Sequence, residues 1–127
     1  MCRLSRSATH PVFKPGQFLT VVVTMPAESV DGQSDPAPER LTRCYSLSDV
    51  PRPDGYRITV KRATAPHSSP EDAVGRVSTF LHAHAAVGST LEVRAPSGQF
   101  VITSDAMVPV VLVGGGIGIT PLLSMLI

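Results

Sequence analysis

Apolar and polar positions alternate along several short segments of the chain, which is the pattern of a β-strand with one face toward a core. Segments 17–25, 56–62 and 91–95 follow this pattern, and 42–48 has strand-like composition. The turn-forming sequence PRPDG at 51–55 separates two of them. In the first segment, the more apolar face consists of Leu19, Val21, Val23 and Met25.

A spacing of three and four residues replaces alternation at 77–85, which predicts a short helix. Two long segments, 27–41 and 63–73, are rich in proline and serine and have no periodicity, as is typical of surface loops. Several short strands separated by turns, with a single short helix, predict a small antiparallel barrel.

The C-terminal segment has a different pattern. Residues 108–113 read VPVVLV without alternation, and three glycines and helical sequence follow. A continuous apolar strand is typical of a parallel sheet that is buried on both faces. We therefore expect a β-barrel domain over 1–107 and the start of an α/β domain over 108–127. Because the sequence stops at Ile127 within an apolar periodic run, we expect it to be a fragment of a longer protein.

Composition narrows the functional classes. The 127 residues are 43% hydrophobic, and 11 basic and 10 acidic residues give a formal net charge of +1. We expect no nucleic-acid partner, because there is no clustered basic stripe. The two cysteines, Cys2 and Cys44, are too few for a disulfide framework and favour a reducing, cytoplasmic location. The longest apolar runs fall far below the roughly 20 residues that span a bilayer, and the N-terminus lacks a signal-peptide core.

A glycine-rich loop over 114–121 follows the apolar segment and opens a helix. It reads G-x-G-x-x-P across Gly116, Gly118 and Pro121. Glycines let backbone amides approach a phosphate closely, and proline suits the first helical position. No Lys-Ser/Thr pair follows, which excludes a triphosphate-binding loop. A tight strand-to-helix turn without a ligand is the alternative.

Arg43 and Tyr45 lie two residues apart in a predicted strand, so their side chains share a face. A cation beside a flat aromatic ring suits a ligand that has both a phosphate and a planar ring. The alternative is a surface ion pair beside a core tyrosine. Cys44 is expected on the opposite face as a small apolar filler.

The start of the predicted helix, GRVS at 75–78, combines a glycine, free N–H groups and a serine hydroxyl, which together suit an anion. An ordinary helix cap is the alternative. His82 and His84 are two apart and cannot jointly bind a metal, so we expect no metal site and assign His82 to packing against the helix or the adjacent loop.

Five motifs in this order resemble the ferredoxin–NADP reductase superfamily, and more closely the flavohaemoglobin reductase module and the reductases of oxygenases. They are F-x-P-G-Q-F at 13–18, R-x-Y-S-L at 43–47, Y-R-I-T-V-K-R at 56–62, G-x-V-S-x-x-L-H at 75–82 and G-G-G-I-G-I-T-P at 114–121. The resemblance implies a mainly β fold: a six-stranded antiparallel Greek-key barrel with one short helix, then the first β-strand and helix start of an α/β nucleotide-binding domain. No clear strand precedes Phe13, so we expect the first barrel strand to be short or missing.

The resemblance also implies residue roles at a flavin. Arg43 would contact the flavin phosphate, and Tyr45 would lie against the isoalloxazine ring. Ser46 would hydrogen-bond near N5, the atom that accepts hydride. Val60 and Lys61 would offer backbone groups to the flavin.

Further roles lie in the helix and in the glycine loop. The phosphates would be held at the helix N-terminus by Gly75, Val77 and Ser78. Thr120 would lie near the junction of flavin and nicotinamide, and is implied as catalytic together with Ser46. The pyrophosphate turn of the dinucleotide would be formed by Gly115, Gly116 and Gly118.

The implied function is a flavin-dependent oxidoreductase module that passes electrons from NAD(P)H through FAD, with FMN as the alternative, to a haem, an iron–sulfur centre or another acceptor. The implied partners are a nicotinamide dinucleotide and a redox partner domain or protein. The fragment alone is expected to be inactive. A non-catalytic flavin-binding regulatory or electron-transfer subunit is the alternative, and a barrel without a cofactor is a third.

Overall fold

The computed structural model describes residues 2–5, 10–26, 37–63, 75–103 and 108–126. Most of the two predicted loops lies outside these ranges, as does the expected domain boundary at Met107.

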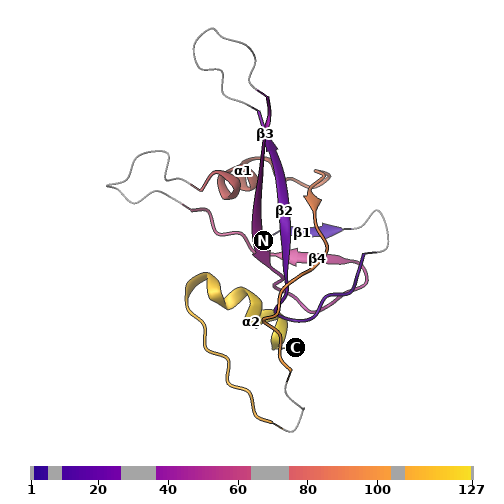
Figure 1. The fold of residues 1–127 in the computed structure, drawn as a ribbon, viewed down its shortest axis with the longest axis vertical. Helices are drawn as coiled ribbons and strands as arrows, with labels where there is room; N and C mark the ends of the chain where they lie inside the picture. Colours follow the sequence, from indigo (N-terminus) through magenta and orange to yellow (C-terminus); the bar gives the residue numbers. More distant parts are fainter. Residues whose placement is uncertain (1, 6–9, 27–36, 64–74, 104–107, 127) are drawn as a thin grey trace, which may run out of the picture.

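Two antiparallel sheets make up the β-structure (Figure 1). Strands β3 (Glu39–Ser46), β2 (Phe18–Met25) and β5 (Glu92–Val93) form one sheet in that order, with β2 in the centre. The second sheet pairs β1 (Cys2–Ser5) with β4 (Gly55–Ile58). The mainly β, antiparallel architecture with few helices is therefore confirmed.

The two sheets are joined directly after β3. Leu47 forms a bridge with Ile58 at the end of β4, and its N–H donates to the carbonyl of Gln17 at 2.9 Å. Both Leu47 and Ile58 are fully buried. The chain therefore passes from one sheet into the other at a point that lies inside the core.

The core lies between the three-stranded sheet, helix α1 (Arg76–His84) and β4, which contributes Tyr56 and Ile58. The alternation predicted for the first segment is confirmed, because its apolar face is buried. From α1, Val77 and Leu81 pack against the same cluster. The core residues of β2 are Leu19, Val21, Val23 and Met25.

The first strand is present and short, with four residues, as one of the two expected outcomes. All four residues of β1 pair with β4, and Leu4 lies opposite Tyr56. The polar sequence of β1 hides it from a hydrophobic pattern, because its stability comes from backbone pairing with β4. Within the described residues the strands number five, in two sheets, and closure into a six-stranded barrel is not seen among them.

Several predicted strand limits are wrong by a few residues. β3 begins at Glu39 rather than at Thr42, because all eight of its residues pair with β2. β4 ends at Ile58, since its partner β1 is only four residues long, so Val60 and Lys61 lie beyond the strand. Pairing partners therefore set these limits.

The predicted buried strand at 108–113 is not formed, which corrects the expectation of a first α/β strand. Val111 and Val113 are 84% and 88% exposed, and no described segment pairs with this one. A parallel strand needs hydrogen-bonding neighbours, so an apolar sequence alone does not create one. Figure 1 shows this segment running apart from the sheets toward α2.

The glycine loop and the helix after it are formed. A 3₁₀ turn, η2 (Gly116–Gly118), leads into helix α2 (Ile119–Met125). Pro121 is the third helical residue rather than the first, which still places it in the first turn, where a missing N–H costs nothing.

Helix α2 is anchored to the loop before β2. The fully buried hydroxyl of Ser124 accepts a hydrogen bond from the N–H of Gly16 at 2.9 Å and donates to the carbonyl of Pro121 at 2.7 Å. A Cβ on Gly16 would overlap the carbonyl of Phe100 and the methyl group of Met125, and the φ of Gly16 is +96°. Only glycine fits at this contact.

The core face of β2 should dominate the stability of the protein. Val21→Ala should lower the free energy of unfolding by about 1.5–3 kcal/mol, because Val21 is fully buried. The matched control Val111→Ala removes the same atoms from an exposed site and should change it by less than about 0.5 kcal/mol. Chemical denaturation measures both, and equal losses would contradict this core assignment.

Gly16 and Gly88 provide a second matched pair. Both have positive φ, +96° and +92°, but a Cβ on Gly88 meets no atom within 4 Å. Gly88→Ala should cost only backbone strain, about 1–2 kcal/mol. Gly16→Ala should cost a further ~1–3 kcal/mol because of overlap. Thermal unfolding compares the two variants, and equal destabilisation would show that α2 does not pack closely on Gly16.

Candidate functional site

Arg43 and Tyr45 lie on the core-facing side of β3, at the edge of the sheet. Tyr45 is paired with Leu19 and Arg43 with Val21, and paired residues share a face. Tyr45 is half-buried and Arg43 is exposed. The expectation that these two side chains share a face is confirmed.

The environment of Tyr45 is partly apolar and partly cationic. Burial raises the pKa of its phenol, and the positive charge of Arg43 acts in the opposite direction. One N–H of the Arg43 guanidinium donates to the carbonyl of Thr42 at 2.8 Å. Because the guanidinium is exposed and carries several further donors, it can bind an anion beside the ring of Tyr45.

Cys44 has a different environment from the one expected. It lies on the opposite face from Arg43, as predicted, but it is exposed. Its Sγ is 3.7 Å from the hydroxyl oxygen of Thr20. Cys44 is therefore not a core filler, because β3 is an edge strand and this side of it is uncovered.

The N-terminus of α1 lies over the same face of β3 as Arg43. The Arg76 guanidinium donates to the carboxylate of Glu39 at 2.7 Å, and this hydrogen bond holds the pKa of Glu39 below its ordinary value. Glu39 and Arg43 are four residues apart on one strand, so they share a face. The ion pair is exposed and contributes little to stability, but it orients the start of α1.

Gly75 and Ser78 join the start of α1 to Ala63. The buried Ser78 hydroxyl donates to the carbonyl of Gly75 at 2.8 Å and accepts from the N–H of Ala63 at 3.1 Å. A Cβ on Gly75 would lie 2.6 Å from the Cβ of Ala63, so close approach requires glycine there. No side chain caps α1. The groups that α1 offers to an anion are thus its backbone N–H groups, including that of Val77.

The segment after β4, which carries Val60 and Lys61, is hydrogen-bonded to α1. Val60 packs against the core, and Lys61 is exposed. The carbonyl of Val60 accepts a hydrogen bond from Nε2 of His82 at 3.0 Å. The expectation that His82 packs against the adjacent loop is confirmed. This carbonyl is accordingly already bonded within the protein.

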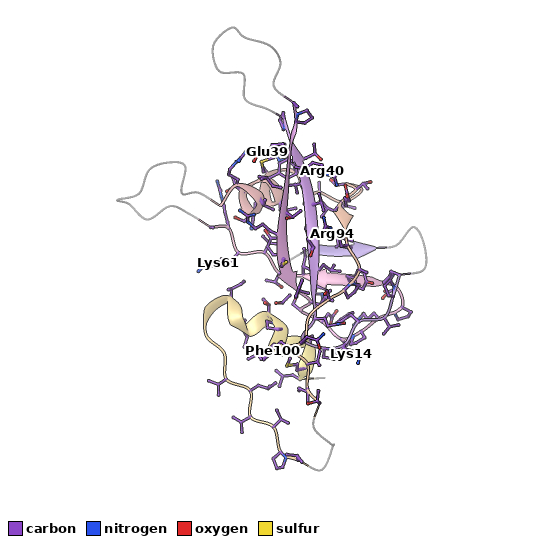
Figure 2. All side chains as sticks on the ribbon, in the orientation of Figure 1. Lys14, Glu39, Arg40, Lys61, Arg94 and Phe100 are labelled. Atoms are coloured by element: carbon purple, nitrogen blue, oxygen red, sulfur yellow. The ribbon has the colours of Figure 1, made fainter. Side chains whose placement is uncertain are left out.

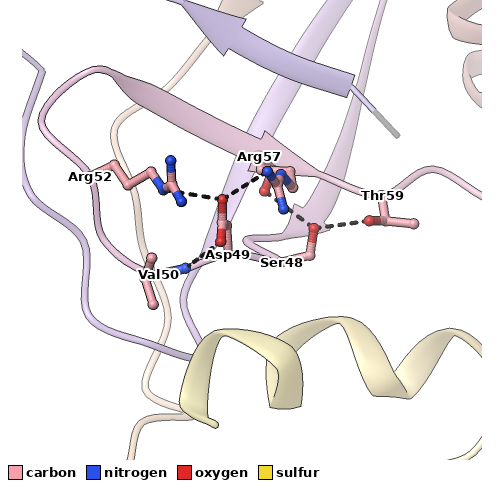
Figure 3. Close-up of polar contacts among 6 residues, drawn as sticks. All are labelled: Ser48, Asp49, Val50, Arg52, Arg57 and Thr59. Carbon is pink, nitrogen blue, oxygen red and sulfur yellow. Dashed lines mark hydrogen bonds and ion pairs between the residues drawn. The ribbon is translucent and has the colours of Figure 1, made fainter. Parts of the chain in front are cut away.

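A polar network that the sequence did not reveal fixes the chain after Ser46 (Figure 3). The Asp49 carboxylate lies between the guanidinium groups of Arg57 at 3.2 Å and Arg52 at 3.4 Å. The Ser48 N–H donates to the carbonyl of Arg57 at 2.9 Å. The only sequence signal is an acidic residue with arginines three and eight positions later. This spacing does not predict an ion pair with Arg57, because the contact forms only when β4 folds back beside Asp49.

Ser46 itself is half-buried at the end of β3, opposite Phe18. Two residues on, Ser48 is buried, and its hydroxyl lies 2.9 Å from that of Thr59. The strand end that carries Ser46 is therefore held between β2 and the segment after β4.

The glycine turn is open to a ligand. The backbone at Gly115, Gly116 and Gly118 is exposed, and a Cβ at any of the three would meet no atom within 4 Å. The N–H of Gly118 donates to the carbonyl of Gly115 at 3.0 Å, which holds the turn. Thr120 is buried, and its hydroxyl donates to the carbonyl of Ile117 at 2.9 Å.

The described residues contain neither a metal-binding cluster nor a membrane-spanning helix. Within the described residues, there is no group of three or more His, Cys, Asp or Glu side chains that could hold a metal ion. None of the described helices has the length and hydropathy to cross a bilayer.

The fold and the site together define the class of protein. The structure matches the solved flavohem-like FAD/NAD-binding domain of nitric oxide dioxygenase from Vibrio cholerae O1 biovar El Tor, with a TM-score of 0.75 and 31% identity. The match covers 97% of this chain and 47% of that one. The fold is therefore that of a ferredoxin-reductase-like FAD-binding domain, the class that the five motifs indicated.

Sequence comparison finds homologues of this chain among the flavohemoproteins. Flavohemoproteins from Halalkalibacterium halodurans, Bacillus cereus and Dictyostelium discoideum (flavohemoprotein B) are 42%, 41% and 39% identical over 113, 114 and 112 residues, which is 88–90% of this chain. The chain is homologous to the reductase region of the flavohemoproteins, a module of the ferredoxin–NADP reductase type. It spans 25% of the length of these curated relatives. No protein-family profile matches it.

The closeness of Arg43 and Tyr45 can be tested by titration. Because the positive charge of Arg43 lowers the pKa of Tyr45 against the effect of burial, Arg43→Ala should raise that pKa further. Ultraviolet absorbance of tyrosinate, with Tyr45→Phe as the reference for Tyr56, measures the shift. The raised pKa of Tyr45 stabilises the fold below about pH 10, and this contribution is lost as pH rises through the folded-state value. An unchanged pKa of Tyr45 in Arg43→Ala would show that the two side chains are not close to each other.

Proposed function

We propose that the chain is the flavin-binding part of an NAD(P)H-dependent flavin oxidoreductase of the flavohemoprotein type, which binds FAD and passes electrons to a haem. The observation that carries the proposal is the position of the Arg43 cation and the half-buried Tyr45 ring on one face of β3, beneath the uncapped N-terminus of α1. The homology to flavohemoproteins and to a solved FAD/NAD-binding domain supports it.

The residues present fit a flavin nucleotide in a defined way. An exposed guanidinium and the backbone N–H groups of α1 suit its phosphates, and a partly apolar phenol ring suits its isoalloxazine. The hydroxyl of Ser46 makes no hydrogen bond within the described part of the chain, which leaves it available to a ligand. Ser78 and the carbonyl of Val60 are bonded internally, so Val77 and Lys61 would contribute through backbone N–H groups. The N–H of Gly75 donates to the carbonyl of Ala63 at 3.4 Å, so Gly75 would contribute by allowing close approach of the backbone to the phosphates.

When bound, FAD supplies hydride acceptance from a nicotinamide and electron release to the haem acceptor. The chain contributes binding and orientation. Tyr45 and Arg43 fix ring and phosphate on one face, while Ser46 is held at the strand end by Leu47 and Ser48. Thr120 is proposed at the approach to the nicotinamide, and the open backbone of the glycine turn at the pyrophosphate of the dinucleotide.

The proposal extends to architecture and location. We assign residues 1–107 to the flavin-binding domain and 108–127 to the start of an NAD(P)-binding domain. The bridge from Leu47 to Ile58, which joins the two sheets, supports closure into a six-stranded Greek-key barrel. The glycine turn and helix α2, which follow the exposed apolar segment at 108–113, support the second of these domains. An exposed free Cys44 supports a reducing, cytoplasmic location.

Flavin binding can be tested with two arginines of the same strand. Arg43→Ala should weaken FAD binding by about 1.5–3 kcal/mol, roughly 10- to 150-fold in Kd, because it removes a charge-assisted hydrogen bond. Arg40→Ala is the matched control, since Arg40 lies on the opposite face of β3 and pairs with Glu92 at 2.6 Å. Flavin fluorescence on titration gives the Kd of each variant.

The possible results test separately the role of Arg43, the identity of the cofactor and flavin binding itself. Unchanged FAD affinity in Arg43→Ala would remove Arg43 from the phosphate site. Equal weakening in both variants would show a general effect of charge rather than a contact. A protein that retains FMN in preference to FAD would reassign the cofactor, and one that retains neither would overturn the proposed function.

A further inference from the structure

We propose that His82 is a positioning residue that fastens helix α1 to the segment 60–63, so that the phosphate side and the ring side of the flavin site move as one body. The inference rests on the proposed function, in which α1 and Arg43 meet the phosphates, and Tyr45 with segment 60–63 meets the ring. It concerns a side chain to which the five motifs assigned no role in binding.

Three hydrogen bonds join α1 to this segment. Nε2 of His82 donates to the carbonyl of Val60 at 3.0 Å, and the N–H of Ala63 donates to the Ser78 hydroxyl at 3.1 Å. The N–H of Gly75 donates to the carbonyl of Ala63 at 3.4 Å. The residues on the helix side are spaced three and four apart, so they lie along one face of α1.

These hydrogen bonds fix the position of α1 along the segment, which apolar packing alone does not do. Val77 and Leu81 hold α1 against the core, but hydrophobic contact is non-directional and permits the helix to slide or rotate. Hydrogen bonds have narrow distance and angle requirements, so they fix the position of the helix along the segment. The contacts at Gly75 and Ser78 lie at the first turn, and His82 provides the fastening at the other end.

His84 shows what the same side chain does without a bridging contact. Its Nδ1 donates to the carbonyl of Phe80 at 3.1 Å within α1, and its ring stacks on the Phe80 ring at 4.5 Å. Both histidines are exposed and both lie in the last two turns of the helix. His84→Ala is therefore a matched control that removes an imidazole but leaves the contact between α1 and segment 60–63.

The test compares two ligands that differ by a phosphate. Riboflavin carries the ring alone and FMN carries ring and phosphate. The ratio of the riboflavin Kd to the FMN Kd therefore measures the contribution of the phosphate contacts, which come from α1 and from Arg43. His82→Ala should lower this ratio by about three- to tenfold, the scale of one lost hydrogen bond. His82→Gln can place an amide N–H near the same carbonyl and should restore most of it, and His84→Ala should leave it unchanged.

A second measurement needs no flavin. Hydrogen exchange at the Ala63 amide, compared with the amides of β2, should be faster in His82→Ala than in the parent and His84→Ala, because the fastening at the far end of α1 is lost. Faster exchange at Ala63 alone supports local loosening, whereas equal acceleration across β2 would indicate global destabilisation and overturn the inference.

The outcomes distinguish this inference from the proposed function. Equal loss of riboflavin and FMN affinity in His82→Ala, or identical behaviour of the His82→Ala and His84→Ala variants, would overturn it while flavin binding stands. A parent protein that binds neither flavin overturns the proposed function. In that case, unchanged exchange at Ala63 overturns the fastening role of His82, and faster exchange supports it.

Discussion

The pairing of β2 with β3 sets which side chains can meet a ligand. One face of β2 is buried in the core, and the register places Tyr45 opposite Leu19 and Arg43 opposite Val21. Because side chains alternate with a period of two, a slip of one residue would turn Arg43 and Tyr45 to the other face. The burial of Leu19 and Val21 opposes such a slip. The apolar core thus fixes the orientation of the polar site at its edge.

Directional polar contacts then place the other parts around this edge. Helix α1 is oriented by Arg76 at one end and by His82 at the other, and both contacts join it to strands or segments from elsewhere in the chain. The chain after Ser46 is held by Ser48 and Asp49 (Figure 3). Figure 2 shows Glu39 and Arg40 near one end of the sheet and Lys14 and Phe100 near α2. Burial therefore determines which face of each strand points toward the core, and hydrogen bonds then fix where α1 and the chain after Ser46 lie.

Internal bonding changes how some motif residues can act. The Ser78 hydroxyl and the Val60 carbonyl, which the resemblance assigned to a flavin, both bond to other parts of the chain. A group that is bonded in this way organises the site, and neighbouring backbone N–H groups remain for the ligand. Arg43 and Ser46 differ, because the first is exposed and the second makes no side-chain hydrogen bond within the described residues.

Strand prediction succeeded where alternation was strong and one face was buried, as in β2. It failed for β1, whose polar residues form a strand only because β4 pairs with them, and for 108–113, whose apolar residues find no described partner. In both cases the deciding term is backbone hydrogen bonding to a segment distant in sequence. The face of Cys44 was predicted correctly but its burial was not, because its exposure depends on whether another part of the chain covers that face.

The sequence by itself determined the antiparallel β architecture, a short helix within one residue of its observed limits, the shared face of Arg43 and Tyr45, and the resemblance to the flavohaemoglobin reductase module. These follow from periodicity and local motifs, which neighbouring residues encode. Only the tertiary structure decided which hydroxyls and carbonyls are already bonded, how Asp49 meets its two arginines, and that His82 reaches Val60. Those contacts join segments far apart in the chain, and their geometry exists only after the core has brought the segments together.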